Sequence, residues 1–117
     1  MSTLEELDGL LDRIDAEARR LGRPQNVELT VDGAGTLGIV LGHDRSVLNH
    51  IPSDLDPPYL ASLGAEDQDR AFTFYVRGDH HTESHWRHTV PAGEARDAAR
   101  VFLLTEALDD RVRWDVV

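Results

Sequence analysis

The spacing of apolar residues predicts a helix at each end of the chain. Near the start, apolar side chains recur at intervals of three and four, the spacing of a helix with one buried face; they are Leu4, Leu7, Leu11, Ile14, Ala18 and Leu21. Two overlapping capping boxes, Ser2 with Glu5 and Thr3 with Glu6, mark the start of this helix, and Gly22 and Pro24 predict its end. We expect the stripe to pack on the rest of the protein. A seam to another chain is the alternative, although the pattern lasts only about three heptads.

A second helix is predicted from about residue 91, followed by a short strand. Its apolar face consists of small residues and then large ones, Ala95, Ala98, Ala99, Phe102 and Leu103. Because alanine side chains are small, this helix can lie close to a sheet. After Asp110 the period changes to two, so Val112, Trp114 and Val116 should lie on one face of a terminal strand and Arg111, Arg113 and Asp115 on the other.

The middle of the chain alternates between apolar and polar residues and predicts short strands. They lie at 27–31, 36–41, 46–51, 59–63 as a short edge strand, 72–76 and, less regularly, 82–90. In the strand at 72–76, Phe72 and Phe74 should point inward. Gly33 and Gly35 form a bare G-x-G, but a strand follows instead of a helix, so this turn predicts a hairpin and not a phosphate-binding loop.

These elements predict an α+β fold. We expect an antiparallel meander sheet with an N-terminal helix and a C-terminal helix packed on it, ending in a strand. The chain of 117 residues has the length of a single domain. Within residues 1–117, the N-terminal helix falls at 1–24, the strands at 27–90, and the second helix with the final strand at 91–117.

Composition narrows the classes of function. The formal net charge is -10, from 22 acidic and 12 basic residues, which opposes binding to nucleic-acid phosphates and favours a basic partner. Solubility is the alternative reason for this charge. The chain has no cysteine, which excludes disulfides and thiolate–metal sites. It shows no membrane-spanning apolar run and no leader, so we expect a cytoplasmic protein that does not bind membranes.

Four histidines, His80, His81, His85 and His88, lie close together in the sequence. On a helix, three of them would share a face and suit zinc, but the segment is rich in residues that disfavour helices. In a strand, His81 and His85 would lie roughly 13 Å apart, too far for one metal ion. We therefore expect exposed histidines, no bound metal and no cofactor. A small metal-dependent hydrolase using residues 80–88 is the alternative. Asp115, beside Trp114, is the only candidate for an acid–base catalyst, and the alternation of the terminal strand predicts that it points outward.

From Leu37 to Trp114 the order of motifs resembles the first-numbered immunity-protein family of bacterial polymorphic toxin systems. The most specific parts are the segment 42–48, which reads GHDRSVL, and a Val90-Pro91 helix start paired with a late Val112-Arg113-Trp114. Such proteins are small α+β proteins encoded beside secreted toxins, often nucleic-acid deaminases. The resemblance implies a non-enzymatic protein without catalytic residues that binds and occludes a cognate toxin.

Two acidic connections and the turn near the histidines are the candidate contact regions. The candidate toxin-binding residues are Asp54, Asp56, Glu66, Asp67, Asp69, Asp79 and Trp86. Core packing is the alternative role for Trp86, and simple solvation is the alternative for the acids. A further alternative for the whole protein is a structural or regulatory subunit of an oligomer, paired through the stripe from Leu4 to Leu21. The oligomeric state stays open.

Overall fold

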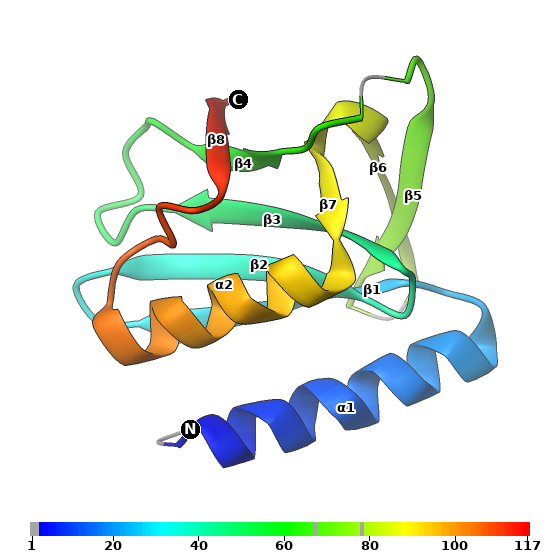
Figure 1. Cartoon of the computed structure of the whole chain (residues 1–117), viewed down its shortest axis with the longest axis horizontal. Coiled ribbons are helices and arrows are strands. Elements are labelled where there is room, and N and C mark those ends of the chain that lie inside the picture. Colours follow the sequence, from blue (N-terminus) through cyan, green and yellow to red (C-terminus); the bar gives the residue numbers. More distant parts are fainter. Residues whose placement is uncertain (1–2, 67, 78) are drawn as a thin grey trace.

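Two helices lie on one face of a curled sheet in the computed structural model, which describes residues 3–66, 68–77 and 79–117 (Figure 1). The helices are α1 (Leu4–Leu21) and α2 (Ala92–Thr105). The strands are β1 (Gln25–Val31), β2 (Gly35–Leu41), β3 (Arg45–Ile51), β4 (Leu60–Leu63), β5 (Ala71–Val76), β6 (His80–His85), β7 (Thr89–Pro91) and β8 (Arg113–Val116), with a 3-10 turn, η1 (Trp86–His88), between β6 and β7. The predicted α+β class, with its terminal strand, is confirmed.

The strand order is β6-β5-β1-β2-β3-β4-β8, with β7 paired to the start of β3. Strands β1 to β4 form the predicted antiparallel meander, whereas the β5–β6 hairpin returns to the outer side of β1. There β5 and β1 pair in parallel, with Gln25 opposite Tyr75. The strand predicted at 59–63 is present as β4. Its predicted position at the edge of the sheet is wrong, because β8 pairs along the outer side of β4, with Leu60 opposite Val116. The terminal strand thus takes the edge position.

Helix α1 follows its sequence signals closely. The Thr3 hydroxyl accepts a hydrogen bond from the Glu6 N–H at 3.1 Å, and Gly22 ends the helix in the left-handed conformation, with a φ of 66°. Leu7 and Leu11 are fully buried against the sheet, so most of the apolar stripe packs within the chain. Within the described ranges, no helix is long and apolar enough to cross a membrane.

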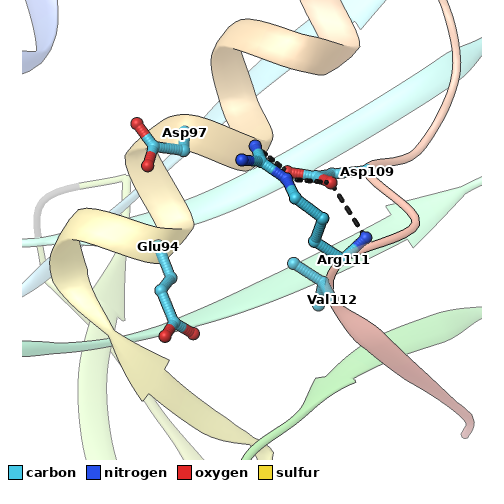
Figure 2. A pocket seen from close by; sticks show the side chains of 5 residues that line it. All are labelled: Glu94, Asp97, Asp109, Arg111 and Val112. Carbon is cyan, nitrogen blue, oxygen red and sulfur yellow. Dashed lines mark hydrogen bonds and ion pairs between the residues drawn. The ribbon is translucent and has the colours of Figure 1, made fainter.

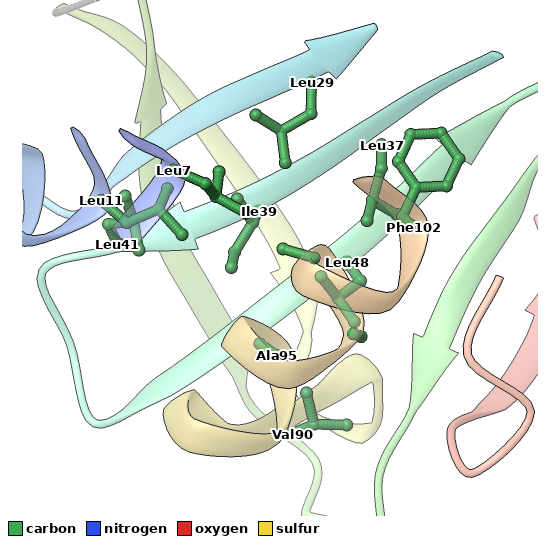
Figure 3. Close-up of a cluster of buried hydrophobic side chains, with 12 residues drawn as sticks. Leu7, Leu11, Leu29, Leu37, Ile39, Leu41, Leu48, Val90, Ala95 and Phe102 are labelled. Carbon is green, nitrogen blue, oxygen red and sulfur yellow. The ribbon is translucent and has the colours of Figure 1, made fainter. Parts of the chain in front are cut away.

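The main core lies between the two helices and the sheet (Figure 3). Leu37 and Ile39 of β2 meet Phe102 and the alanines of α2, which are buried as their spacing predicted. Two ion pairs join the helices on the outside, from Arg96 to Asp12 and from Arg100 to Asp8, both at 2.8 Å. The small alanine face therefore positions α2 on the sheet beside α1.

A second, smaller core fills the opposite face of the sheet. It contains Val40, Val47, Phe72, Phe74 and Trp86. Phe72 and Phe74 point inward as predicted, and β2 is buried on both faces because its alternate residues enter the two cores. The sheet curls so that the β5–β6 hairpin contributes to this second core. The segment predicted as one irregular strand at 82–90 is divided into β6, η1 and β7.

Candidate functional site

The segment from Gly42 to Leu48 organises one end of the sheet. Gly42 has a φ of 98°, and a Cβ there would lie 2.5 Å from the Cβ of Ala18, so the turn approaches α1 closely. The Gly42 N–H donates to Asp15 at 2.8 Å. The Arg45 guanidinium donates to the Thr89 carbonyl at 2.8 Å and so fastens β3 to β7. This segment therefore joins β3 to α1 and to β7, and the contact with Thr89 fixes the position of the Arg45 side chain.

Next to Arg45 lies a group that we call the tryptophan cluster, made of Trp86, Glu66, Arg45 and Arg70. The Trp86 indole N–H donates to the Glu66 carboxylate at 2.9 Å. The guanidinium carbons of Arg70 and Arg45 lie 4.0 and 5.8 Å from the centre of the indole ring, within the range of cation–π attraction. Arg45 also lies 3.9 Å from Glu66. Each charged group of the cluster thus has a partner inside the chain.

The structure brings two predicted site residues, Glu66 and Trp86, into direct contact, and a third, Asp69, lies nearby. Asp69 is fully exposed, and its carboxylate lies 3.7 Å from the His85 ring nitrogen. Trp86 is only 7% exposed and belongs to the second core. The tryptophan therefore supports the shape of this surface more than it contributes contact area.

The other predicted site residues lie elsewhere. Asp54 and Asp56 occupy the β3–β4 connection, at the opposite end of β3 from Arg45, about 20 Å along seven residues of strand. Asp79 precedes β6 at the end of the β5–β6 hairpin that lies away from Trp86. Asp67 lies outside the described residues. The described acids thus fall in three separate places and do not form one site.

A groove beside the tryptophan cluster runs between α2 and the segment that leads into β8 (Figure 2). It has a volume of about 240 Å³ and is lined by Glu94, Asp97, Asp109, Arg111 and Val112. A neighbouring groove shares Glu94, Arg111 and Val112 and extends to Arg45 and Glu66. The two grooves therefore join the C-terminal segment to the tryptophan cluster through side chains of both charges.

Asp109 is the buried acid of this groove, at 4% exposure. It accepts hydrogen bonds from the Arg111 side chain at 2.8 and 3.0 Å and from the Arg111 backbone N–H at 3.0 Å. The side-chain hydrogen bonds from Arg111 lower the pKa of Asp109 below its usual value. Asp109 is thus held ionised as a structural acceptor that fixes the turn before β8.

The histidine segment does not build a metal site among the described residues, which contain no group of three potential metal ligands. His80, His81 and His85 lie on β6, a strand, as the sequence favoured. All four histidines of the segment were predicted to be exposed, and this prediction is wrong for His88, which is 8% exposed. The Nε2 of His88 lies 3.0 Å from the Asp115 carboxylate. That hydrogen bond lowers the pKa of Asp115. Asp115, predicted to point outward, instead ties β8 to η1.

Arg45 and Arg70 were missed as partners of Trp86. Nothing in the local sequence marks them, because β3, the β4–β5 connection and η1 meet only after the sheet has formed. The partial signal was the GHDRSVL segment, which contains Arg45. Also missed were exposed apolar residues of the β3–β4 connection, which follow no period.

The fold and these surfaces define a small α+β protein in which ion pairs and cation–π contacts join elements that are distant in the chain. The model of the family Immunity protein Imm1 matches residues 1–115. The chain therefore belongs to the Imm1 immunity-protein family, and the family resemblance of the sequence is confirmed over more of the chain than its motifs covered. No curated protein matches the chain by sequence.

Proposed function

We propose that this protein binds a cognate secreted toxin in the cytoplasm and neutralises it by covering the toxin surface. Membership of the Imm1 immunity-protein family over residues 1–115 is the observation that carries this proposal. An immunity protein acts through the shape and charge of its surface, so it needs a stable framework and no reacting group. The paired charges of the tryptophan cluster fit such a framework.

We further propose that the toxin acts on nucleic acid and that its substrate cleft is basic. The net charge of -10 supports this, because complementary charge speeds the encounter of two proteins and favours the correct partner. A chain with this charge would be repelled by the phosphates of the substrate itself. The protein would therefore inhibit by binding the toxin in place of its nucleic-acid substrate, and not by binding the nucleic acid.

The proposed contact residues remain the acids of the connections and Trp86. Asp54, Asp56, Asp69 and Asp79 are exposed and available to a partner. Glu66 is exposed as well, although its carboxylate already accepts the Trp86 N–H. Trp86 would act from beneath the surface, by holding Glu66 and Arg70 in place. Asp67 completes the set of proposed contacts.

Co-expression tests the function directly. The full chain would be expressed together with the toxic domain encoded beside its gene, and growth and complex formation would be measured. We expect growth to be restored and the two proteins to elute as one stable complex. A toxic domain from an unrelated system serves as the control and should stay lethal. If co-expression with the neighbouring toxic domain gives no rescue of growth and no binding, the proposed function is excluded.

A further inference from the structure

Exposed apolar side chains gather at one place on the described part of the molecule. Among the described residues, seven large apolar side chains are exposed. Four of them come from the end of β3, the β3–β4 connection and the C-terminal end of the chain, namely Ile51, Leu55, Tyr59 and Val117. We call this group the apolar corner. Leu55 is the most exposed of the four, at 69%.

Strand pairing brings the members of the apolar corner together. Strands β3, β4 and β8 are neighbours in the sheet (Figure 1). Because the register pairs His50 with Leu60 and Leu60 with Val116, the next positions, Ile51, Tyr59 and Val117, lie beside one another on the other face of the sheet. The Val117 N–H donates to the Tyr59 carbonyl at 2.9 Å, and the Tyr59 hydroxyl donates to the Leu55 carbonyl at 2.6 Å. Two segments separated by about half of the chain thus present apolar side chains side by side.

The β3–β4 connection holds Leu55 outward in a fixed conformation. Leu55 has a φ of 66°, a conformation that leucine rarely adopts. Its N–H donates to the Pro52 carbonyl at 3.0 Å, and the Asp56 N–H donates to the Asp54 carboxylate at 3.0 Å. A loop that is already ordered loses less conformational entropy when a partner binds. The strained backbone therefore serves to display a leucine that the core does not use.

Acidic side chains border the apolar corner, and no arginine or lysine occurs between positions 46 and 69 or between 114 and 117. Asp54 and Asp56 lie within the β3–β4 connection. Asp32 lies in the β1–β2 turn. This turn adjoins the apolar corner, because Gly35 at its end lies so close to Ile51 that a Cβ on Gly35 would collide with the Ile51 carbonyl. Among the described residues, Asp32 and Asp56 have no ion-pair partner. The border of the apolar corner is thus negative and not neutralised within the chain.

We infer that the apolar corner is the surface on which this protein seats its protein partner. This inference rests on the proposed function, since the partner is the toxin. An apolar centre with a polar border is the anatomy of a specific interface, and a tyrosine is a favoured anchor. The partner should present an apolar depression bordered by arginine or lysine. A second copy of this chain fits poorly, because a two-fold contact would place the same acids against each other.

Removing the Leu55 side chain tests the apolar centre. The substitution Leu55→Gly suits the φ of 66°, so it deletes contact area without adding strain. We expect the affinity for the purified neighbouring toxic domain to fall by about 30-fold or more, the effect of an interface anchor, measured by calorimetry on the full chain. Val117→Thr keeps the β-branched shape and should weaken binding less. Leu21→Ser changes another exposed leucine on α1 and should leave binding unchanged.

Charge removal tests the border. The double change Asp54→Asn and Asp56→Asn should slow association with the toxic domain at low salt, and the difference from the wild type should vanish at high salt. The double change Glu28→Gln and Asp110→Asn removes two exposed acids that belong neither to the apolar corner nor to the proposed contacts, and is the matched control. Slower association with this control and not with the Asp54/Asp56 double variant would overturn the inference.

The outcomes separate the two proposals. If the wild type binds the toxic domain and Leu55→Gly and Val117→Thr bind it equally well, the inference is overturned and the proposed function stands. If the wild type does not bind, both fall. Sedimentation of the free chain should also give the same oligomeric state for the wild type and for Leu55→Gly. A wild-type dimer that Leu55→Gly converts to a monomer would show that a second copy covers the corner, and would overturn the inference.

Discussion

The tryptophan cluster and the apolar corner lie at different ends of the same sheet and use their residues in opposite ways. In the tryptophan cluster a large aromatic residue is 7% exposed, and two arginines and a glutamate satisfy one another around it. In the apolar corner a leucine is 69% exposed, and the neighbouring acids Asp32 and Asp56 have no ion-pair partner among the residues that the structure describes. The type of a residue therefore does not by itself predict whether it serves the core or the surface.

The physical difference lies in what a partner would have to replace. Around Trp86, a partner would compete with hydrogen bonds and cation–π contacts that already exist. At the apolar corner, a partner would cover apolar area that water now contacts and would supply the missing positive charge. Contiguous exposed apolar area gives nothing to folding and commonly marks an interaction surface. The apolar corner can therefore contribute free energy to the binding of a partner, whereas the contacts of the tryptophan cluster contribute to the stability of the fold.

The largest expected effect is on stability, at the tryptophan cluster. Trp86→Ala should lower the free energy of unfolding by about 3–5 kcal/mol, because it leaves a cavity in the second core. Urea unfolding followed by circular dichroism would measure it. Trp86→Phe is the control, because it keeps a ring in the core and removes the N–H that Glu66 accepts. A loss of less than about 1 kcal/mol in the alanine variant would mean that the cluster is not structural.

A smaller effect is expected at the link between β8 and η1. His88 lowers the pKa of Asp115, so the folded state binds this proton less readily than the unfolded state. The stabilisation is thus present above about pH 4 and is lost as the pH falls through the lowered pKa. Asp115→Asn should reduce stability at neutral pH and flatten the acid limb of a stability-against-pH curve. Asp56→Asn, at a position with no described ion pair, should keep the wild-type slope; equal slopes in all three proteins would contradict the role of the His88 contact.

The smallest expected effect on stability is at the apolar corner. Leu55→Gly should change the free energy of unfolding by less than about 0.5 kcal/mol, because the side chain is mostly exposed and the relief of strain opposes the entropy cost of glycine. Thermal unfolding of the free chain would measure it. A loss of more than about 2 kcal/mol would place Leu55 in the core and remove the contrast between the two regions.

Much of the candidate site could be predicted only as separate pieces. The sequence indicated Glu66 and Trp86, but not that the carboxylate accepts the indole N–H, since these residues come from different elements. It indicated Asp54 and Asp56 because acids and prolines mark a loop. It did not indicate Leu55 between them, because a single leucine in a loop has no period that predicts its burial or exposure.

Short-range signals were enough to predict the local structure: α1 and its end at Gly22, the β1–β2 hairpin, the alanine face of α2 and the terminal strand. These features depend on interactions between residues close in the chain, which spacing and capping residues specify. No short-range signal predicted that β5 pairs in parallel with β1, that β8 lies outside β4 at the edge of the sheet, or that His88 is buried against Asp115. Those contacts join distant segments, and their energy depends on which surfaces remain to be covered once the local elements have formed.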